Sequence, residues 1–203
     1  MVTERRKQRM HQVLLDRQRD LTVICENIHD PHNVSAILRT CDAVGISTVH
    51  LLYTSEVFPK LGKKSSASAK KWLEFRRHKN YDDLHNLLKA DKMTIYATHV
   101  DPSSQKIYEV DWTKPAAILL GNEHRGVSEQ ALKIADKTIY IPMHGMVQSL
   151  NVSVAAAVIL YEAYRQRLQR QMYPYSSGDK WVKKHFSEWI GETKKSKTNK
   201  KVN

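Results

Sequence analysis

The fold of this chain can be predicted outward from the segment Ile141-Pro142-Met143-His144-Gly145-Met146-Val147-Gln148-Ser149-Leu150-Asn151-Val152-Ser153-Val154-Ala155. A β-branched strand is predicted to end at Ile141, and a helix is predicted to begin near Ser149 or Asn151. Asn151 and Ser153 can cap this helix, because their side-chain oxygens can accept hydrogen bonds from the unpaired N–H groups of its first turn. A loop that joins a strand end to a helix N-terminus is where α/β proteins usually bind ligands.

The composition indicates one domain of ordinary size, with extensions, and a strongly basic surface. The chain has 203 residues and a mass of 23.5 kDa, and 41% of its residues are hydrophobic, which is enough for a real core. It carries 33 Lys and Arg against 21 Asp and Glu, a formal charge of +12 and a pI near 9.7. Such a charge favours a polyanionic partner, of which nucleic acid is the commonest, although a merely basic surface is the alternative.

Several protein classes are disfavoured by the sequence. Cys25 and Cys41 lie in apolar stretches without a Cys-x-x-Cys pair, so we expect buried free thiols. The charged segment 1–9 lacks the apolar run of a signal peptide, and no stretch approaches the ~18 apolar residues of a membrane span. His29 and His32 have no acidic partner pattern, so we expect no metal site. We therefore expect a cytoplasmic protein.

Predicted strands and helices alternate along the chain. Strands are expected at 21–25, 48–53, 72–75, 93–98, 115–120 and 137–141. Helices are expected at 3–18, from 31 to a stop at Gly45, at 81–90, from about 128, at 151–172 and at 180–190. This alternation predicts an α/β fold with a mostly parallel sheet that is covered by helices on both faces.

The ends of the chain and one internal window are rich in basic residues. We expect an N-terminal basic helical extension at 1–19, the α/β domain at 20–172, a C-terminal helical extension at 173–191 and a disordered lysine-rich tail at 192–203. The window 60–79 carries eight Lys and Arg residues against Glu74 alone, and its serines suggest a flexible loop. Trp181 and Trp189 have helical spacing, which favours packing over base stacking.

Three polar loops follow predicted strands, and the carboxyl ends of parallel strands meet at one edge of a sheet. The loops supply Asn33 and Arg39; Gly121, Asn122, Glu123 and Gly126; and Gly145, Ser149 and Asn151. Each residue taken alone has a structural explanation as a helix cap, a surface charge or a turn former. Their arrangement in three loops predicts one shared site.

The three loops resemble, in order and wording, the three motifs of the SpoU/TrmH family in the SPOUT class of RNA methyltransferases. The matching segments are Asn33-Val34-Ser35-Ala36-Ile37-Leu38-Arg39-Thr40, Leu120-Gly121-Asn122-Glu123-His124-Arg125-Gly126-Val127-Ser128, and the segment Ile141–Ala155 quoted above. The resemblance spans roughly residues 20–172. It implies a deep trefoil knot in the C-terminal part of the fold, a homodimer, S-adenosylmethionine as cofactor and transfer of a methyl group to a ribose 2′-hydroxyl.

The resemblance also implies roles for individual residues. The catalytic residues would be Arg39, Asn33, Glu123, Ser149 and Asn151. The cofactor would contact Thr98, His99, Gly121, Ile141, Met143 and Leu150. RNA would bind to Arg5, Arg6, Lys63, Lys64, Lys70, Lys71 and Arg165. The family assigns activation of the hydroxyl to Arg39, but a guanidinium with a pKa above ~12 is a poor free base. An RNA phosphate held by Arg39 could orient the hydroxyl and share its proton.

Different members of the family methylate different RNA substrates. The helices expected at both ends and the wording of 145–149 and 161–167 favour the tRNA enzymes that methylate the D-loop guanosine at tRNA position 18. The alternatives are methylation of rRNA or of the tRNA wobble nucleotide, and an RNA-binding relative without activity. The presence of Asn33, Arg39, Glu123 and Asn151 argues against the inactive relative, because a binding protein need not keep them all.

Overall fold

The computed structural model describes residues 2–59, 69–174 and 178–191. The chain divides into two compact units, one formed by residues 18–170 and one that combines residues 1–17 with 171–203. The expected flexible loop at 65–68 and the expected disordered tail at 192–203 lie outside the described residues.

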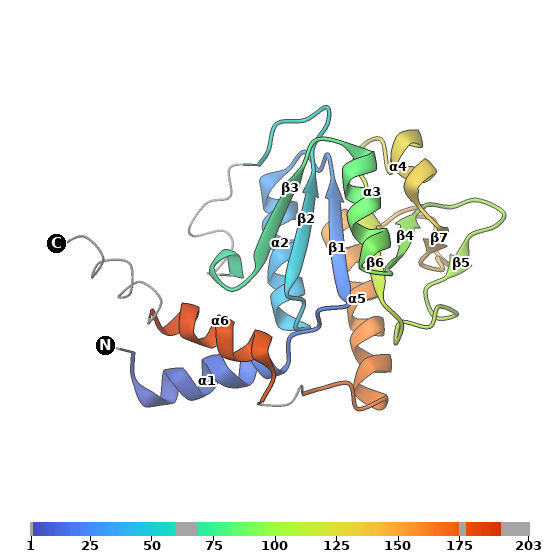
Figure 1. Ribbon diagram of the computed structural model, residues 1–203. Coiled ribbons are helices and arrows are strands. Elements are labelled where there is room, and N and C mark those ends of the chain that lie inside the picture. The colour runs from blue at the N-terminus through green and yellow to red at the C-terminus, as the bar shows by residue number, and fades with distance from the viewer. Residues whose placement is uncertain (1, 60–68, 175–177, 192–203) are drawn as a thin grey trace. The chain divides into compact units, whose positions relative to one another are not determined.

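The larger unit is a parallel sheet with helices on both faces (Figure 1). Its strands are β1 Leu21–Glu26, β2 Thr48–Leu52, β3 Glu74–His78, β4 Thr94–Thr98, β5 Gln105–Lys106, β6 Ala116–Leu120 and β7 Lys137–Tyr140. Its α-helices are α2 Pro31–Ala43, α3 Tyr81–Ala90, α4 Glu129–Ile134 and α5 Val152–Gln169, and a short 3-10 helix, η1, spans Ala69–Lys71. The predicted alternation of strands and helices is confirmed.

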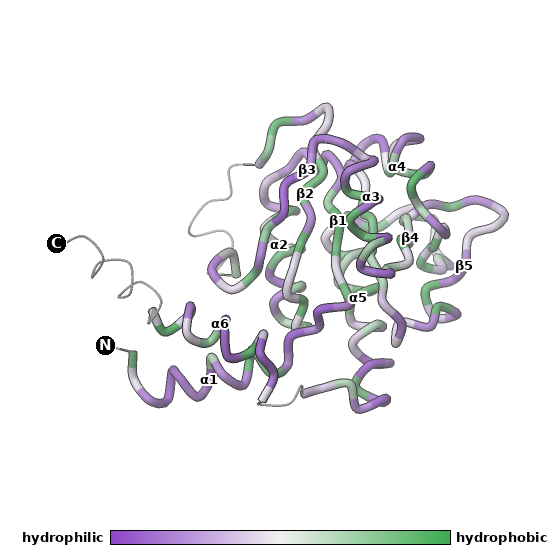
Figure 2. Tube along the Cα trace, viewed as in Figure 1, coloured by the Kyte–Doolittle hydropathy of each residue, from purple (hydrophilic) through white to green (hydrophobic). Residues whose placement is uncertain are grey.

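The sheet has the strand order β3-β2-β1-β6-β4-β7-β5, and all pairings between these strands are parallel. Apolar side chains of α2 and α5 pack on one face of the sheet, and those of α3 and α4 pack on the other. The interior strand β1 is buried along its whole length and mostly hydrophobic (Figure 2), as a strand covered on both faces must be. Cys25 and Cys41 are buried and form no disulfide, as predicted.

Two edge strands differ from the sequence prediction. The strand expected at 72–75 instead spans Glu74–His78, and β5 was not predicted at all. Both lie at the ends of the strand order. An edge strand pairs through its backbone on one side only, so its side chains need not follow an apolar pattern. The basic sequence of β3 therefore indicated a strand with the wrong bounds, and the two polar residues of β5 gave no usable signal.

Arg167 is a fully buried cation near the end of α5. Its Nε donates to the carbonyl of Trp112 at 2.8 Å, and Nη1 donates to the Gln18 side chain at 2.8 Å. An ion pair with Asp20 at 2.5 Å supplies the compensating charge. Because a buried guanidinium is stable only when its donors are paired, this residue attaches the end of α5 to the start of β1 and to the segment before β6.

Two histidines face each other across β2 and β3. His50 Nδ1 and His78 Nε2 are 2.9 Å apart and share a hydrogen bond, and the rings are stacked with centroids 5.1 Å apart. Burial lowers the pKa of His50 to about 3, and the neighbouring His78 and Arg76 act in the same direction. His50 is therefore neutral in the folded protein at any pH near neutrality.

This pair predicts a decrease in stability in mild acid. An unfolded His50 takes up a proton as the pH falls below about 6.5, whereas the folded one does not until about pH 3, so protonation favours unfolding across that interval. Between pH 7.5 and 5.0 the free energy of unfolding should fall by about 2 kcal/mol from this residue. Urea titrations at both pH values measure it, with His50→Asn as the control. An equal pH dependence in both proteins would contradict the prediction.

The second unit contains α1 Glu4–Leu15 and α6 Lys180–Ile190, which pack against each other. The rings of His11 and Phe186 meet edge to face at 5.4 Å, and Arg17 lies over the ring of Trp189 at 5.9 Å. Thr3 caps α1, as predicted, because its side chain accepts from the N–H of Arg6. In the described part of the chain, no helix is long and apolar enough to cross a bilayer.

Candidate active site

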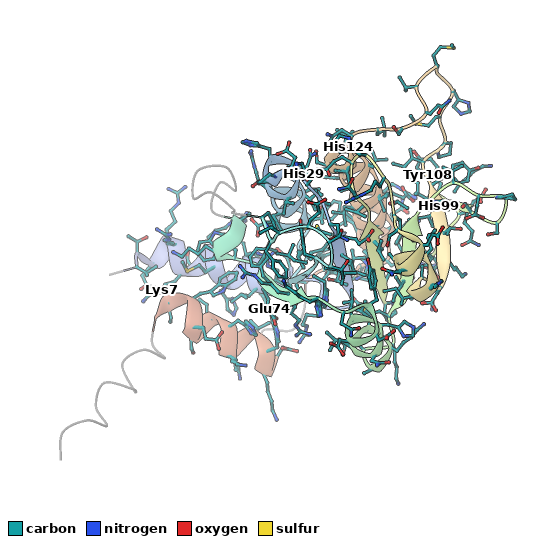
Figure 3. All side chains as sticks on the ribbon, turned by 90° about the horizontal axis from the view of Figure 1, so that it is seen from above. Lys7, His29, Glu74, His99, Tyr108 and His124 are labelled. Atoms are coloured by element: carbon teal, nitrogen blue, oxygen red, sulfur yellow. The ribbon has the colours of Figure 1, made fainter. Side chains whose placement is uncertain are left out.

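The predicted site loops meet at the carboxyl edge of the sheet. Strands β1, β6, β4 and β7 are consecutive neighbours in the sheet, so the loops that follow them are also neighbours. Figure 3 views this edge from above and shows His29 and His124 on two adjoining loops, with His99 on the far side of the site. The parallel topology therefore produces the convergence that was predicted from sequence.

Glu123 joins the loop after β6 to the start of α2. Its carboxylate accepts hydrogen bonds from the backbone N–H of His29 at 2.8 Å, the N–H of Asp30 at 3.0 Å and Asn33 Nδ2 at 2.9 Å. Partial burial raises the pKa of Glu123, but the hydrogen bonds from Asn33 and the two N–H groups outweigh it, so the pKa lies below its usual value. The carboxylate is therefore ionised at neutral pH.

Asn33 continues this chain of contacts to the third loop. Its Oδ1 accepts from Asn151 Nδ2 at 3.1 Å, while its own amide donates to Glu123. Asn151 is also the N-cap of α5, accepting from the N–H of Ser153 at 2.9 Å. Side chains from all three loops are thus joined in one series, Asn151–Asn33–Glu123. The cap predicted at Asn151 is confirmed, whereas Ser153 lies inside the helix and donates its hydroxyl to Asn151.

The loop after β6 is held by its own backbone. Asn122 and Gly126 exchange both backbone hydrogen bonds, at 3.0 and 2.8 Å, and Asn122 Nδ2 donates to the carbonyl of Asn27 at 2.7 Å. Gly126 has a positive φ of 69°. A Cβ at Gly121 would lie 2.3 Å from the carbonyl carbon of Gly126, so the turn requires glycine there.

A cavity of about 640 Å³ lies among the loops after β4, β6 and β7. Each of the six residues expected to contact the cofactor lines it: Thr98, His99, Gly121, Ile141, Met143 and Leu150. Glu123, Ser149 and Asn151 line it as well. The structure thus brings the six predicted cofactor residues together with three of the five predicted catalytic residues. Further lining residues that the sequence did not suggest include Val100, Gln148 and Ile159.

The loop after β4 is shaped by hydroxyl groups. Ser104 Oγ lies within hydrogen-bond distance of the His99 carbonyl, at 3.0 Å, and of Thr138 Oγ1, at 2.9 Å, and it accepts from the N–H of Asp101 at 2.9 Å. Hydrogen bonds from Ser103, Thr138 and Ser104 lower the pKa of Asp101 well below its usual value. This cluster positions Thr98 and His99 at the cavity, and sequence reasoning missed it.

Arg39 does not line the cavity. It is an exposed residue of α2, and it has no hydrogen bond or ion pair to any described residue. Asn33 lies on the same helix, and its side chain contacts Glu123 and Asn151, which line the cavity. Arg39 instead faces solvent. Among the five predicted catalytic residues, all of them described, Arg39 alone neither lines the cavity nor hydrogen-bonds to a residue that does.

The residues predicted to bind RNA belong to both units of the chain. Arg5 and Arg6 are exposed on α1, in the smaller unit. Lys71 is exposed and lies over the ring of Trp72 at 4.9 Å. Arg165 pairs with Glu162 through two bonds of 2.8 Å, so its guanidinium is already engaged. Lys63, Lys64 and the side chain of Lys70 lie outside the described residues.

A hydrogen-bonded network beside the site was not predicted. Asn27, with a φ of 48°, accepts at Oδ1 from the N–H groups of Thr54, Ser55 and Glu56 at 2.9–3.2 Å. It thereby attaches the loop after β2 to the loop after β1. No motif marks Asn27, because its partners lie more than twenty residues away in the chain. Among the described residues, no group of three or more His, Cys, Asp or Glu could hold a metal ion.

Known proteins share this arrangement. The model of the SpoU rRNA Methylase family matches residues 20–161. A Thermus thermophilus protein named tRNA (guanosine(18)-2'-O)-methyltransferase is 48% identical over 189 residues, which are 93% of this chain and 97% of that protein.

Solved structures agree with the sequence comparison. The TrmH/SpoU tRNA modifying enzyme of Aquifex aeolicus has a TM-score of 0.86 and 40% identity, with 94% of this chain and 97% of that chain covered. The SpoU methyltransferase AviRb of Streptomyces viridochromogenes, solved with the cofactor AdoMet, has a TM-score of 0.67 and 27% identity, with 76% and 64% covered. Because the family model covers well over half of the sequence, this chain belongs to the SpoU rRNA Methylase family.

Proposed function

We propose that this protein transfers a methyl group from S-adenosylmethionine to the 2′-hydroxyl of the D-loop guanosine at tRNA position 18. The observation that carries the reaction type is the series Asn151–Asn33–Glu123, which borders the cavity and joins the three family motifs. The choice of substrate rests on relatives with 40–48% identity over most of this chain that are named for that reaction.

The cavity suits the cofactor in size and lining. Its volume of about 640 Å³ is within the range of small-molecule sites, and apolar residues such as Ile141 and Ile159 share the lining with His99 and Asn122. An adenosyl group has apolar faces and polar edges, which this combination accommodates. When bound, S-adenosylmethionine supplies an electrophilic methyl group on sulfonium. Thr98, Gly121, Met143 and Leu150 would hold it together with His99 and Ile141.

The chain's own residues would mainly orient the ribose. Well-oriented reactants can lower a barrier by ~7–11 kcal/mol, so positioning is expected to be the larger effect. Asn33, Glu123, Ser149 and Asn151 would fix the site loops and the ribose. Arg39 would hold an RNA phosphate that orients the hydroxyl and accepts its proton, because a guanidinium does not lose a proton near neutral pH.

We also infer a homodimer. Val154, Tyr161 and Leu168 recur every seven residues on α5, so they share one side of the helix, and about half of each side chain is exposed. A second copy of the chain would cover this apolar stripe. A sedimentation experiment that gives a monomer at micromolar concentration would contradict the dimer. The trefoil knot and a cytoplasmic location also remain predictions, supported by family membership.

The basic residues of the smaller unit would bind the tRNA outside the target nucleotide. Arg5 and Arg6 are exposed on α1, where they can neutralise phosphates. Lys63, Lys64, Lys70, Lys71 and Arg165 complete the proposed set. Arg165 would have to leave Glu162 before it could bind a phosphate.

The function can be tested with an unmodified tRNA transcript and labelled S-adenosylmethionine. Nucleoside mass spectrometry should find 2′-O-methylguanosine, and digestion into fragments should place it in the D-loop. A transcript with a 2′-deoxyguanosine at position 18 is the matched control and should accept no label. Cofactor binding without transfer to tRNA would contradict the tRNA assignment, and transfer to rRNA fragments instead would replace it.

A negative charge introduced at Asn33 tests the proposed series of side chains. Asn33→Asp places a second carboxylate about 2.9 Å from Glu123, and two such groups cannot both ionise cheaply. Methyl transfer at pH 8 should fall by about ten-fold or more, since each pKa unit of repulsion is a factor of ten. The ratio of variant to wild-type rate should rise as the pH falls and the pair takes up a proton. Asn33→Ala is the control, because its ratio should not change with pH.

A further inference from the structure

Arg125 borders the cavity but extends away from it. Its backbone N–H is fixed by Asn122 Oδ1 at 3.2 Å, and its Nη2 donates to Glu56 Oε1 at 2.8 Å. Glu56 follows β2, which lies two strands away from β6 in the sheet. The guanidinium therefore points across the end of β1, toward β2 and away from the loops after β4 and β7 that form the opposite side of the cavity.

Phe58, in the loop 53–58, contacts two further cations, which come from β3 and from the residue directly after it. The Arg77 guanidinium and the Lys79 ammonium lie over the ring of Phe58, at 5.2 and 5.3 Å from its centroid. Phe58 is itself packed against Tyr53, with ring centroids 5.2 Å apart. Asn27 holds the backbone of the same loop through three N–H groups. Glu56 and Phe58 thus contact three cations along one segment: Arg125 from the loop after β6, Arg77 from β3 and Lys79 from directly after β3.

These cations are available to a ligand. The side chain of Arg125 is 61% exposed although it is paired with Glu56, and Arg77 and Lys79 are both exposed residues. An aromatic ring contacts the face of a guanidinium and leaves its N–H donors at the edge, where they can bind phosphate. Arg77 and Lys79 are therefore oriented without a carboxylate partner in that contact, whereas Arg125 is oriented by one bond to Glu56 and keeps its other N–H donors for a phosphate. His29 Nδ1 lies 3.4 Å from Glu56 Oε2, the other oxygen of the carboxylate that binds Arg125.

We propose that Arg125, Arg77 and Lys79, the strand-end cations, bind consecutive phosphates of the RNA strand that leads away from the target nucleotide. The proposal rests on the proposed function, which places the target ribose beside Glu123 and Asn33. The strand then runs from the cavity over the loop 53–58 toward β3, along the edge that Figure 3 views from above. Glu56 and Phe58 are positioning residues, because they hold the cations and do not themselves contact RNA.

The test compares single-charge variants in direct binding to unmodified tRNA transcript. Arg125→Ala and Arg77→Ala should each raise the tRNA Kd about ten-fold, the usual size of one charged hydrogen-bonded contact. The slope of log Kobs against log salt should become shallower by about 0.7–0.9 for each phosphate that the variant no longer binds. The Kd for S-adenosylmethionine and the melting temperature should not change. Arg125→Lys keeps the charge without the planar fork and should fall between wild type and Arg125→Ala.

Lys92→Asn is the matched control. Lys92 is an exposed cation in the turn between α3 and β4, at the opposite edge of the sheet, and its φ of 56° is one that asparagine tolerates. The substitution removes the same unit of charge but should alter the tRNA Kd by about two-fold or less, since the two edges lie beyond strong electrostatic range.

Two results would overturn the proposal. One is that Arg125→Ala and Arg77→Ala match Lys92→Asn in Kd and salt slope. The other is that Arg125→Ala weakens binding of S-adenosylmethionine and not of tRNA, which would assign Arg125 to the cofactor cavity. A wild-type protein that binds tRNA without methylating it would contradict the proposed function instead. The comparison of Kd values would still decide the role of the strand-end cations.

Discussion

Replacement of Arg39 by alanine is expected to lower the rate of methyl transfer by about 10²–10³-fold, the usual cost of removing one group that stabilises a transition state. The physical reason is that no other side chain of the proposed catalytic set is a cation. Asn33, Ser149 and Asn151 are neutral, and Glu123 is an ionised carboxylate held by N–H donors. Without Arg39 the phosphate beside the target ribose would lose its fixed position.

The exposure of Arg39 makes the experiment easy to interpret. The side chain has no hydrogen bond to any described residue, so its removal should change the free energy of unfolding by about 0.5 kcal/mol or less. Single-turnover rates, the Kd for S-adenosylmethionine and the melting temperature should be measured together. Arg39→Lys distinguishes charge from geometry, because lysine cannot bind a phosphate through two parallel donors. A variant that keeps its rate within a few-fold would remove Arg39 from the mechanism.

Gly121→Ala should destabilise the whole larger unit. The added Cβ would lie 2.3 Å from both the carbonyl carbon of Gly126 and the nitrogen of Val127, and these backbone atoms cannot rotate away as a side chain could. Either the turn opens, which breaks the exchanged hydrogen bonds of Asn122 and Gly126, or β6 shifts against its two neighbours. We expect the free energy of unfolding to fall by more than about 4 kcal/mol.

Gly145→Ala provides the matched control on the third loop. A Cβ at Gly145 meets no described atom within 4 Å, so this variant should unfold within about 0.5 kcal/mol of the wild type. Urea titration followed by circular dichroism measures both variants, and isothermal titration with S-adenosylmethionine reports on the cavity. Equal stability of the two variants would show that the turn at Gly121 can relax. If Gly121→Ala yields no folded protein while Gly145→Ala does, the predicted destabilisation is present in its most severe form.

Much of the fold could be predicted from local patterns. Buried strands such as β1 and β6 are continuous apolar runs, and helix starts carry capping residues such as Thr3, Ser128 and Asn151. These signals are local, because a buried strand and a first helical turn each impose their requirement on adjacent residues. The three motifs were sufficient to indicate the family, and the family comparison confirmed it.

The sequence predicted that the site loops converge, but it did not predict which of their side chains form hydrogen bonds with one another. The sequence placed Asn33, Glu123 and Asn151 in three loops at one sheet edge, but which atoms meet depends on strand order. Asn33 and Glu123 lie ninety positions apart in the chain, and they meet because β1 and β6 are adjacent in the sheet. The roles of these side chains in catalysis stay predictions.

The sequence by itself determined the alternation of strands and helices, the helix caps and the three motifs, because these depend on neighbours along the chain. Only the tertiary structure decided the bounds of β3 and β5, the position of Arg167 and the orientation of Arg125 toward Glu56. The physical reason is that an edge strand, a buried cation and an oriented surface arginine are each defined by partners far away in the sequence. The identity of one residue does not indicate which distant residues will contact it in the folded protein.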